Sequence, residues 1–357
     1  MRCENVELHA RALNCTSMNN RPPTLTLAAL ALLFVLTIIA FSVGRFAISP
    51  SDLLTVMWAK LSGGTHTLPP TYDAVIFQIR GPRILAAILI GAALSGAGAV
   101  YQNMFRNPLV SPDILGVSSG AALGAVLAIF LALPILVIQG FAFAGGLLAV
   151  AAVYFIGNAV RGHDPILALI LTGVVVGTLF GSGIALMKYL ADPYNQLPTI
   201  TFWLLGSLSS ISPADLWVAI PMVLLGLVPI FLLRWRMNLL SLSDDEAGAL
   251  GVNVGRLRLV IVTCATLITA AAVAISGIIG WIGLLIPHAA RLLIGPEFAR
   301  MLPLSLLLGS CYLLAVDTLA RTMASIEIPP GVLTALIGTP LFLWLLAVTH
   351  SRTRPNS

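Results

Sequence analysis

The sequence predicts an all-α, polytopic membrane protein, and three observations carry that prediction. Of its 357 residues, 58% are hydrophobic and only 9% are charged, whereas a soluble domain carries about 25% charged residues. The mean hydropathy is +0.99. Apolar runs of about 20 residues recur along the chain, and a run of that length spans a bilayer as a helix. We expect about ten such spans.

Short polar or proline-containing segments separate the expected spans. A polar external segment at residues 48–83 follows the first span. A mixed segment at residues 192–213 is either an interfacial helix or a further span. The ten expected spans cover residues 24–46, 84–104, 114–133, 141–160, 166–190, 216–233, 259–279, 281–294, 302–320 and 331–348.

The charges predict which side of the membrane each loop faces. Of the 19 Lys and Arg residues, 13 fall in tails and loops expected inside and six in those expected outside. Such an excess is typical of the cytoplasmic side. Both polar tails, residues 1–23 and 350–357, are therefore expected in the cytoplasm, flanking a membrane domain at 24–349. The MNNRPP string that begins at Met18 would also make a natural start of translation.

A weak repeat relates two halves of the chain, at about residues 80–213 and 255–349. A shift of 175 residues aligns six identities within 38 positions. The first copy enters the membrane from outside and the second from inside, so the repeat is inverted. Inverted repeats with proline-broken short segments in matching places are typical of transporters. The aligned pairs are Arg83 and Arg258, Ala97 and Ala272, Ala99 and Ala274, Leu109 and Leu284, Pro112 and Pro287, and Gly120 and Gly295.

A short polar break separates the second and third spans. Pro108 and Pro112 lack an N–H group, so the helix must stop there. We expect the Asp113 carboxylate to cap the helix that follows. Small residues at every fourth position then predict close packing of helix backbones. These residues are Gly91, Ser95 and Ala99, then Gly116, Gly120 and Gly124, and later Gly173, Gly177 and Gly181.

The longest polar segment expected inside covers residues 234–258. Asp244, Asp245 and Glu246 suit the positive end of a short helix, and Gly251 can terminate it. A solvated loop and a surface helix held by a cytoplasmic partner both fit this composition.

The sequence lacks the motifs of several enzyme classes. It contains no G-x-x-x-x-G-K-[ST] string to cradle phosphates, no H-E-x-x-H and no G-x-S-x-G. The four cysteines show no spacing typical of a metal site. The basic excess suits cytoplasmic loops and does not indicate nucleic-acid binding. We expect no catalysis, no metal site and no cofactor in this chain.

Four ordered strings resemble the FecCD family of permease subunits of type II ABC importers. They are NPLVSPDILGVSSGAALG, DDEAGALGVNVGR, GLLIPHAARLLIG and IEIPPGVLTALIGTPLFLWLL, and the likeness extends from the first span to the tenth. The family takes up ferric siderophores, haem and cobalamin across the inner membrane of bacteria and archaea. The resemblance implies a homodimer of ten-span subunits with two cytoplasmic ATPase subunits and an external binding protein.

The resemblance also implies roles for particular residues. Arg80 and Arg83 in QIRGPR, with Arg321, match arginines that dock the binding protein. Asn107 and Leu109 match an inner gate. The second gate region reads GHDPILAL, and its Pro165 and Ile166 depart from the small hydroxyl residues common in relatives. The coupling helix that receives the ATPase matches Asp244, Asp245, Glu246, Ala247, Gly248, Ala249, Leu250 and Gly251.

Asp317 lies four residues before Arg321, and an ion pair is the economical explanation of an acid within a span.

The sequence does not identify the substrate. The pathway candidates Met104, Phe105 and Met187 are apolar and adaptable, which favours a bulky metal chelate as the cargo. Alternatives are an oxyanion importer of the same family, carrying molybdate or tungstate, and a secondary transporter driven by an ion gradient.

Overall fold

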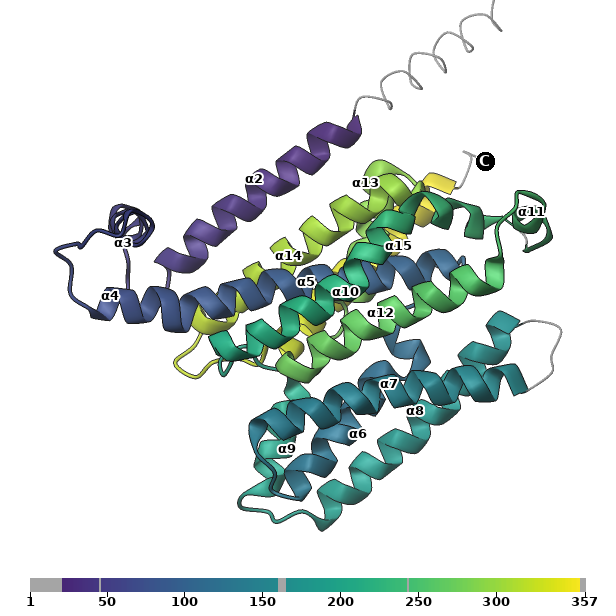
Figure 1. Ribbon diagram of the computed structural model, residues 1–357, viewed down its shortest axis with the longest axis horizontal. Helices are drawn as coiled ribbons and strands as arrows, with labels where there is room; N and C mark the ends of the chain where they lie inside the picture. Colours follow the sequence, from purple (N-terminus) through teal and green to yellow (C-terminus); the bar gives the residue numbers. More distant parts are fainter. Residues whose placement is uncertain (1–20, 45, 160–164, 243, 354–357) are drawn as a thin grey trace, which may run out of the picture.

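The computed structural model describes residues 21–44, 46–159, 165–242 and 244–353, which form a bundle of helices (Figure 1). Eight described helices are long and apolar enough to cross a membrane, and two shorter apolar helices accompany them. The predicted all-helical, polytopic fold is confirmed, and these ten apolar helices fit the expected number of about ten spans. The long helices are α2 (Arg21–Ser42), α5 (Gly81–Met104), α7 (Ile135–Ala159), α8 (Pro165–Leu190), α10 (Pro213–Met237), α12 (Val254–Ser276), α14 (Phe298–Thr322) and α15 (Pro330–Thr353), and the shorter two are α6 (Val117–Phe130) and α13 (Ile282–Ile294).

The segment predicted as polar and external is mostly helical, and its position outside the membrane stays a prediction. It holds α3 (Pro50–Ser62), which Ser49 caps by accepting from the Asp52 N–H at 3.1 Å. A second helix begins at α4 (Thr71–Asp73) and runs through a π-helical turn, η1 (Ala74–Arg80), into α5. The π turn has a local cause, because Pro82 cannot donate and the Gly81 N–H bonds to the Ile76 carbonyl five residues back.

The remaining short helices lie at the two ends of the bundle. α9 (Gln196–Leu205) has ten residues, too few to span a bilayer, so residues 192–213 contain an interfacial-length helix and no further span. α11 (Asp244–Ala249) lies at the end opposite α3 (Figure 1). We call the α3 end the outer end and the α11 end the inner end, after the orientation that the charges predict.

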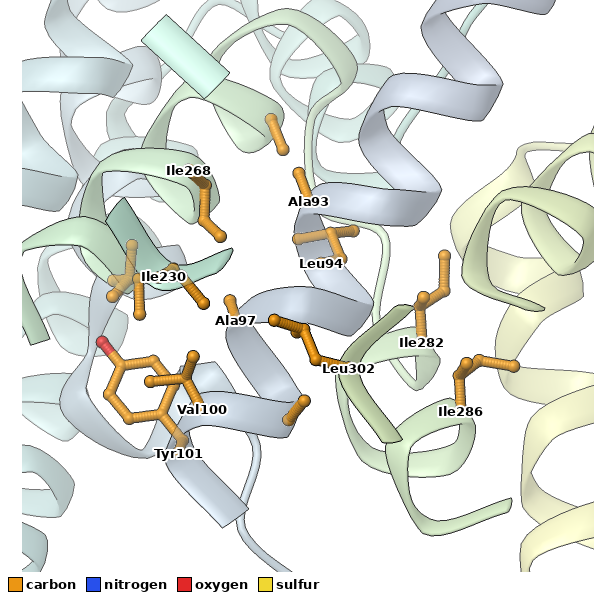
Figure 2. Close-up of a cluster of buried hydrophobic side chains, with 14 of the residues drawn as sticks. Ala93, Leu94, Ala97, Val100, Tyr101, Ile230, Ile268, Ile282, Ile286 and Leu302 are labelled. Carbon is orange, nitrogen blue, oxygen red and sulfur yellow. The ribbon is translucent and has the colours of Figure 1, made fainter. Parts of the chain in front are cut away.

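α5 lies among four other helices and packs against α10, α12, α13 and α14. In the apolar 18-residue stretch of the span that contains α5, 78% of the residues are buried, whereas in that of α8 only 17% are. Figure 2 shows Ala93, Leu94, Ala97, Val100 and Tyr101 of α5 surrounded by side chains from these neighbours. The facing side chains are Ile230 of α10, Ile268 of α12, Ile282 and Ile286 of α13 and Leu302 of α14.

The two halves repeat the same order of elements. α5, α6, α7 and α8 contain 24, 14, 25 and 26 residues, and α12, α13, α14 and α15 contain 23, 13, 25 and 24. The halves also exchange contacts, since α5 packs on α14 and α12 packs on α7. Each half therefore has a long central helix, a short broken helix and two further long ones.

Close backbone contacts hold the crossing helices together. A Cβ added to Gly91 of α5 would collide with the Gly309 carbonyl of α14, and one added to Gly309 would collide with the Gly91 carbonyl. Gly98 meets the Gly283 carbonyl of α13 in the same way. The predicted glycine packing is confirmed at Gly91, because two backbones can approach this closely only where neither residue has a side chain.

Candidate functional site

Arg83 is the centre of a buried ion network at the outer end. From α5 it donates to Asp317 of α14 through Nε at 2.9 Å and Nη2 at 2.7 Å. It also donates to Glu327, in the link between α14 and α15, through Nη1 at 3.2 Å and through Nη2. One guanidinium thus joins α5, α14 and the loop that leads into α15.

Asp317 is fully buried and has a second arginine beside it. Arg321 Nε lies 3.5 Å from the Asp317 carboxylate, so the predicted ion pair within α14 is confirmed. The Arg83 contact is shorter, and sequence spacing could not reveal it. Arg321 also donates to the Ala40 carbonyl at the end of α2, at 2.9 Å. Two arginines and two carboxylates balance in charge, which is what burial of ions requires.

Arg80 binds the segment that connects α2 to α3. Its side chain donates to the carbonyls of Phe41 and Phe46. Arg80 and Arg83 are only 5% and 8% exposed, so both face the interior of this chain. Docking of a binding protein on Arg80, Arg83 and Arg321 stays a prediction, and it requires these arginines to exchange an internal partner for an external one.

The break after α5 is fastened to the inner end of the bundle. Arg106, with φ at 50°, donates to the carbonyls of Leu240, at 3.0 Å, and Leu242. The Asn107 side chain accepts from the Leu109 N–H at 2.9 Å and makes a tight turn. Leu109 is 51% exposed at the tip of that turn. The gate residues predicted there lie together on an exposed loop, and their gating role stays a prediction.

Asp113 does not cap a helix by binding backbone N–H groups as predicted. A 3₁₀ turn, η2 (Pro112–Leu115), comes first and ends at Gly116, whose φ of 75° is left-handed. α6 therefore begins after Gly116, and the Asp113 carboxylate accepts from the Ser118 hydroxyl. Gly116 serves this turn and not a helix face, while Gly120 packs on the Gly145 backbone of α7 as expected.

The predicted coupling segment forms a short exposed helix. α11 ends at Ala249, and Gly251 takes a left-handed φ of 79° beyond it, as the sequence predicts. Ala247 is buried against the core, whereas Gly248, Ala249 and Leu250 are exposed. The side chains of Asp244 and Asp245 lie outside the described residues, and the backbone of these two belongs to α11. The segment thus presents a folded, partly apolar surface at the inner end.

Two of the three pathway candidates are buried. Met104 is 1% and Phe105 6% exposed, because neighbouring helices cover this end of α5. Their burial gives no support to a pathway surface in this structure. Met187 on α8 is half-buried. In the second gate region residues 160–164 lie outside the described residues, and Pro165 begins α8.

One face of α8 is uncovered along most of its length. Gly173 packs against the Ile114 carbonyl, but nothing lies within 4 Å of a Cβ added to Gly181. The uncovered face contains aliphatic and hydroxyl side chains and no charged ones. Its exposed residues are Leu171, Val174, Val175, Thr178, Leu179, Gly181, Ser182, Ala185, Leu186 and Tyr189.

Glu327 is a site residue that the sequence did not predict. It lies in the IEIPPG string, which is readable as a loop but gives no partner for its acid. The one indication in the sequence was that Glu327 is an acid expected at the same level of the membrane as Arg80 and Arg83. Among the described residues, no three His, Cys, Asp or Glu side chains gather as a metal site would need.

Comparison with known proteins gives consistent matches over most of the chain. The profile of the FecCD transport family matches residues 32–348. The molybdate import system permease protein MolB of Haemophilus influenzae is 41% identical over 320 residues, covering 88% of this chain and 93% of the relative. A probable iron chelatin transport system permease protein of Helicobacter pylori is 45% identical over 276 residues, covering 77% and 83%. A solved structure described as an inward-facing conformation of a putative metal-chelate type ABC transporter superimposes with a TM-score of 0.82 at 38% identity, covering 91% of this chain and 99% of that one.

Proposed function

The chain belongs to the FecCD transport family and is the permease subunit of an ABC importer in the inner membrane, and from that premise we propose that it carries a metal chelate inward. The proposed cargo is a bulky complex of the ferric siderophore, haem or cobalamin class. The working unit is a homodimer with two ATPase subunits at its inner end and a binding protein at its outer end. Both chain termini then lie in the cytoplasm.

The uncovered face of α8 is the observation that supports this cargo. A surface of leucine, valine and tyrosine with the hydroxyls of Thr178 and Ser182 suits a large, partly apolar complex. A small oxyanion is held by cations or by several converging N–H donors, and the exposed side chains of α8 offer neither. In a homodimer two such faces would enclose the pathway between the subunits.

The partners divide between the two ends. At the inner end, α11 with its exposed Leu250 would seat the ATPase subunit. At the outer end, acidic residues of the binding protein would compete for Arg83 and Arg321, because a carboxylate pairs strongly with a guanidinium. Asn107 and Leu109 would form the inner gate.

An oxyanion cargo is the second candidate, since the Haemophilus relative named for molybdate import is 41% identical. A secondary transporter has less support. It would need an acid that can exchange its ion or proton within the spans. Asp317, the acid that the sequence singles out, is held by Arg83 and Arg321.

Uptake by the reconstituted transporter tests the proposal. Proteoliposomes would contain the chain with its ATPase subunits and its binding protein, and would be offered a ferric hydroxamate chelate, haemin, cobalamin and molybdate. We expect ATP-dependent uptake of one of the chelates and background uptake of molybdate. Replacing Ser182 on α8 with Trp should block that uptake, while the exposed outer control Ser62→Trp should leave it unchanged. Uptake of molybdate alone would select the oxyanion candidate, and uptake without ATP would contradict an ABC importer.

A further inference from the structure

A groove at the inner end lies between the last turns of α10 and the first turns of α12. It encloses about 560 Å³. Its walls are mainly aliphatic, and two arginines line it, one from each helix. The side chains that matter here are Leu233, Arg236, Leu239, Arg256, Leu257 and Val260.

The groove lies where the apolar surface of the spans gives way to the polar loop. On α10, exposed aliphatic residues such as Leu225 and Leu232 continue down to Trp235, which is 60% exposed. The Arg234 guanidinium lies over the Phe231 ring, 3.9 Å from its centroid. Exposed tryptophan beside arginine is typical of the level of lipid headgroups.

Among the described residues that line the groove, none is an acid that could pair with its two arginines. Arg236 and Arg256 are both exposed, and Glu246 on the neighbouring α11 does not line the groove. Arg256 also lies in the first turn of α12, at the positive end of a helix whose first turn contains no acid. A cation is unfavourable in that position unless an anion accompanies it.

We propose that this groove binds an anionic phospholipid of the membrane. The phosphate would lie between Arg236 and Arg256, and an acyl chain would cover Leu233, Leu257 and Val260. The aliphatic walls distinguish a lipid from free phosphate, which would leave them uncovered. Basic pockets between spans on the cytoplasmic side suit anionic headgroups.

The lipid would also touch the segment proposed to couple to the ATPase. Leu250 and Gly251, which follow α11, line the same groove. A bound lipid would therefore support the connection from α11 into α12. Lipid binding itself does not depend on the cargo or on the ATPase, so its test is separate from the test of the proposed function.

Native mass spectrometry of the full chain tests the proposal, with phosphatidylglycerol and phosphatidylcholine as the probes. We expect wild type to retain phosphatidylglycerol in preference. Each Arg→Gln replacement at Arg236 and Arg256 should weaken that binding about fivefold. Arg300→Gln is the matched control. Arg300 is exposed in the first turn of α14, away from the groove, and pairs with Glu297 at the start of the same helix at 2.7 Å.

Three results would overturn the proposal. They are equal retention of the two lipids, unchanged retention by the double variant, and full competition by glycerol phosphate, which has no acyl chain. Addition of the ATPase subunit separates a lipid site from a protein interface. Loss of bound phosphatidylglycerol on that addition would also overturn the proposal, because the ATPase would then occupy the groove, whereas retention supports the lipid.

Discussion

The outer and inner ends of the bundle both carry arginines, but the two sets have opposite surroundings. At the outer end, Arg80 and Arg83 are buried and bind groups of their own chain. At the inner end, Arg236 and Arg256 are exposed beside an aliphatic groove, and no described residue that lines it is an acid. Burial with a partner makes an arginine a brace between helices, whereas exposure without one leaves it available to a lipid or protein.

Whether an arginine is buried with a partner or left exposed depends on residues that are distant from it in sequence. The acids that hold Arg83 are 234 and 244 residues away in sequence. They reach it because α14 packs along α5. The same side chain next to α10 or α12 at the inner end would meet no such acid among the described residues of the groove.

Removing the acid of the outer network should have the largest effect. Asp317→Asn leaves Arg83 and Arg321 with Glu327 as the remaining carboxylate of the network. Breaking a buried ion pair by removing one partner costs about 3–5 kcal/mol. We expect a loss of that order in the free energy of unfolding, measured in detergent.

The exposed pair of Glu297 and Arg300 provides the control. Its side chains are 35% and 44% exposed, and such pairs contribute about 0–1 kcal/mol. Glu297→Gln should therefore change the free energy of unfolding little. Equal losses from Asp317→Asn and Glu297→Gln would contradict the role of the outer network as a brace.

Breaking α11 should have a smaller effect on stability and a clear effect on coupling. Ala249→Pro removes a backbone donor and crowds the preceding turn, which costs up to about 3 kcal/mol in a helix. Because Ala249 is exposed, we expect the cost to stay local and the transporter to assemble. Binding-protein-stimulated ATP hydrolysis should fall to the unstimulated rate. Ala249→Ser keeps the N–H and serves as the control; normal stimulation in the proline variant would place coupling elsewhere.

The spans and the repeat were predictable because both depend on local patterns. Apolar runs predicted the eight long helices. The two proline-containing strings mark the two short ones, because Pro112 lies in the turn just before α6 and Pro287 lies inside α13. The end of α11 at Gly251 followed from the left-handed conformation that glycine allows. The start at Thr71 of the helix that leads into α5 was not predicted, because Gly81 and Pro82 interrupt the apolar run and the π turn that carries the helix past them is not visible in a sequence pattern.

The ion network was only partly predictable. Asp317 and Arg321 are on one helix, so their spacing of four residues was enough to expect a contact. Arg83 and Glu327 join them only through the packing of α5 on α14, which a single sequence does not specify. The burial of Met104 and Phe105 was unpredictable for the same reason, since it depends on neighbours that are distant in sequence, and their place in a pathway stays a prediction.

The smallest effect is expected where the outer network meets solvent, at Glu327. Its side chain is 32% exposed whereas that of Asp317 is fully buried, so loss of the Glu327 charge should cost less stability than loss of the Asp317 charge. Glu327→Gln would still weaken one competitor for Arg83, while Asp317 keeps the guanidinium in place. If acids of the binding protein dock on Arg83, this variant should bind that protein several-fold more tightly, and the gain should shrink at high salt. Surface plasmon resonance on nanodisc-held transporter would measure it, with Glu297→Gln as the control of equal charge change. Unchanged affinity in both variants would mean that Arg83 braces the outer end without docking the binding protein.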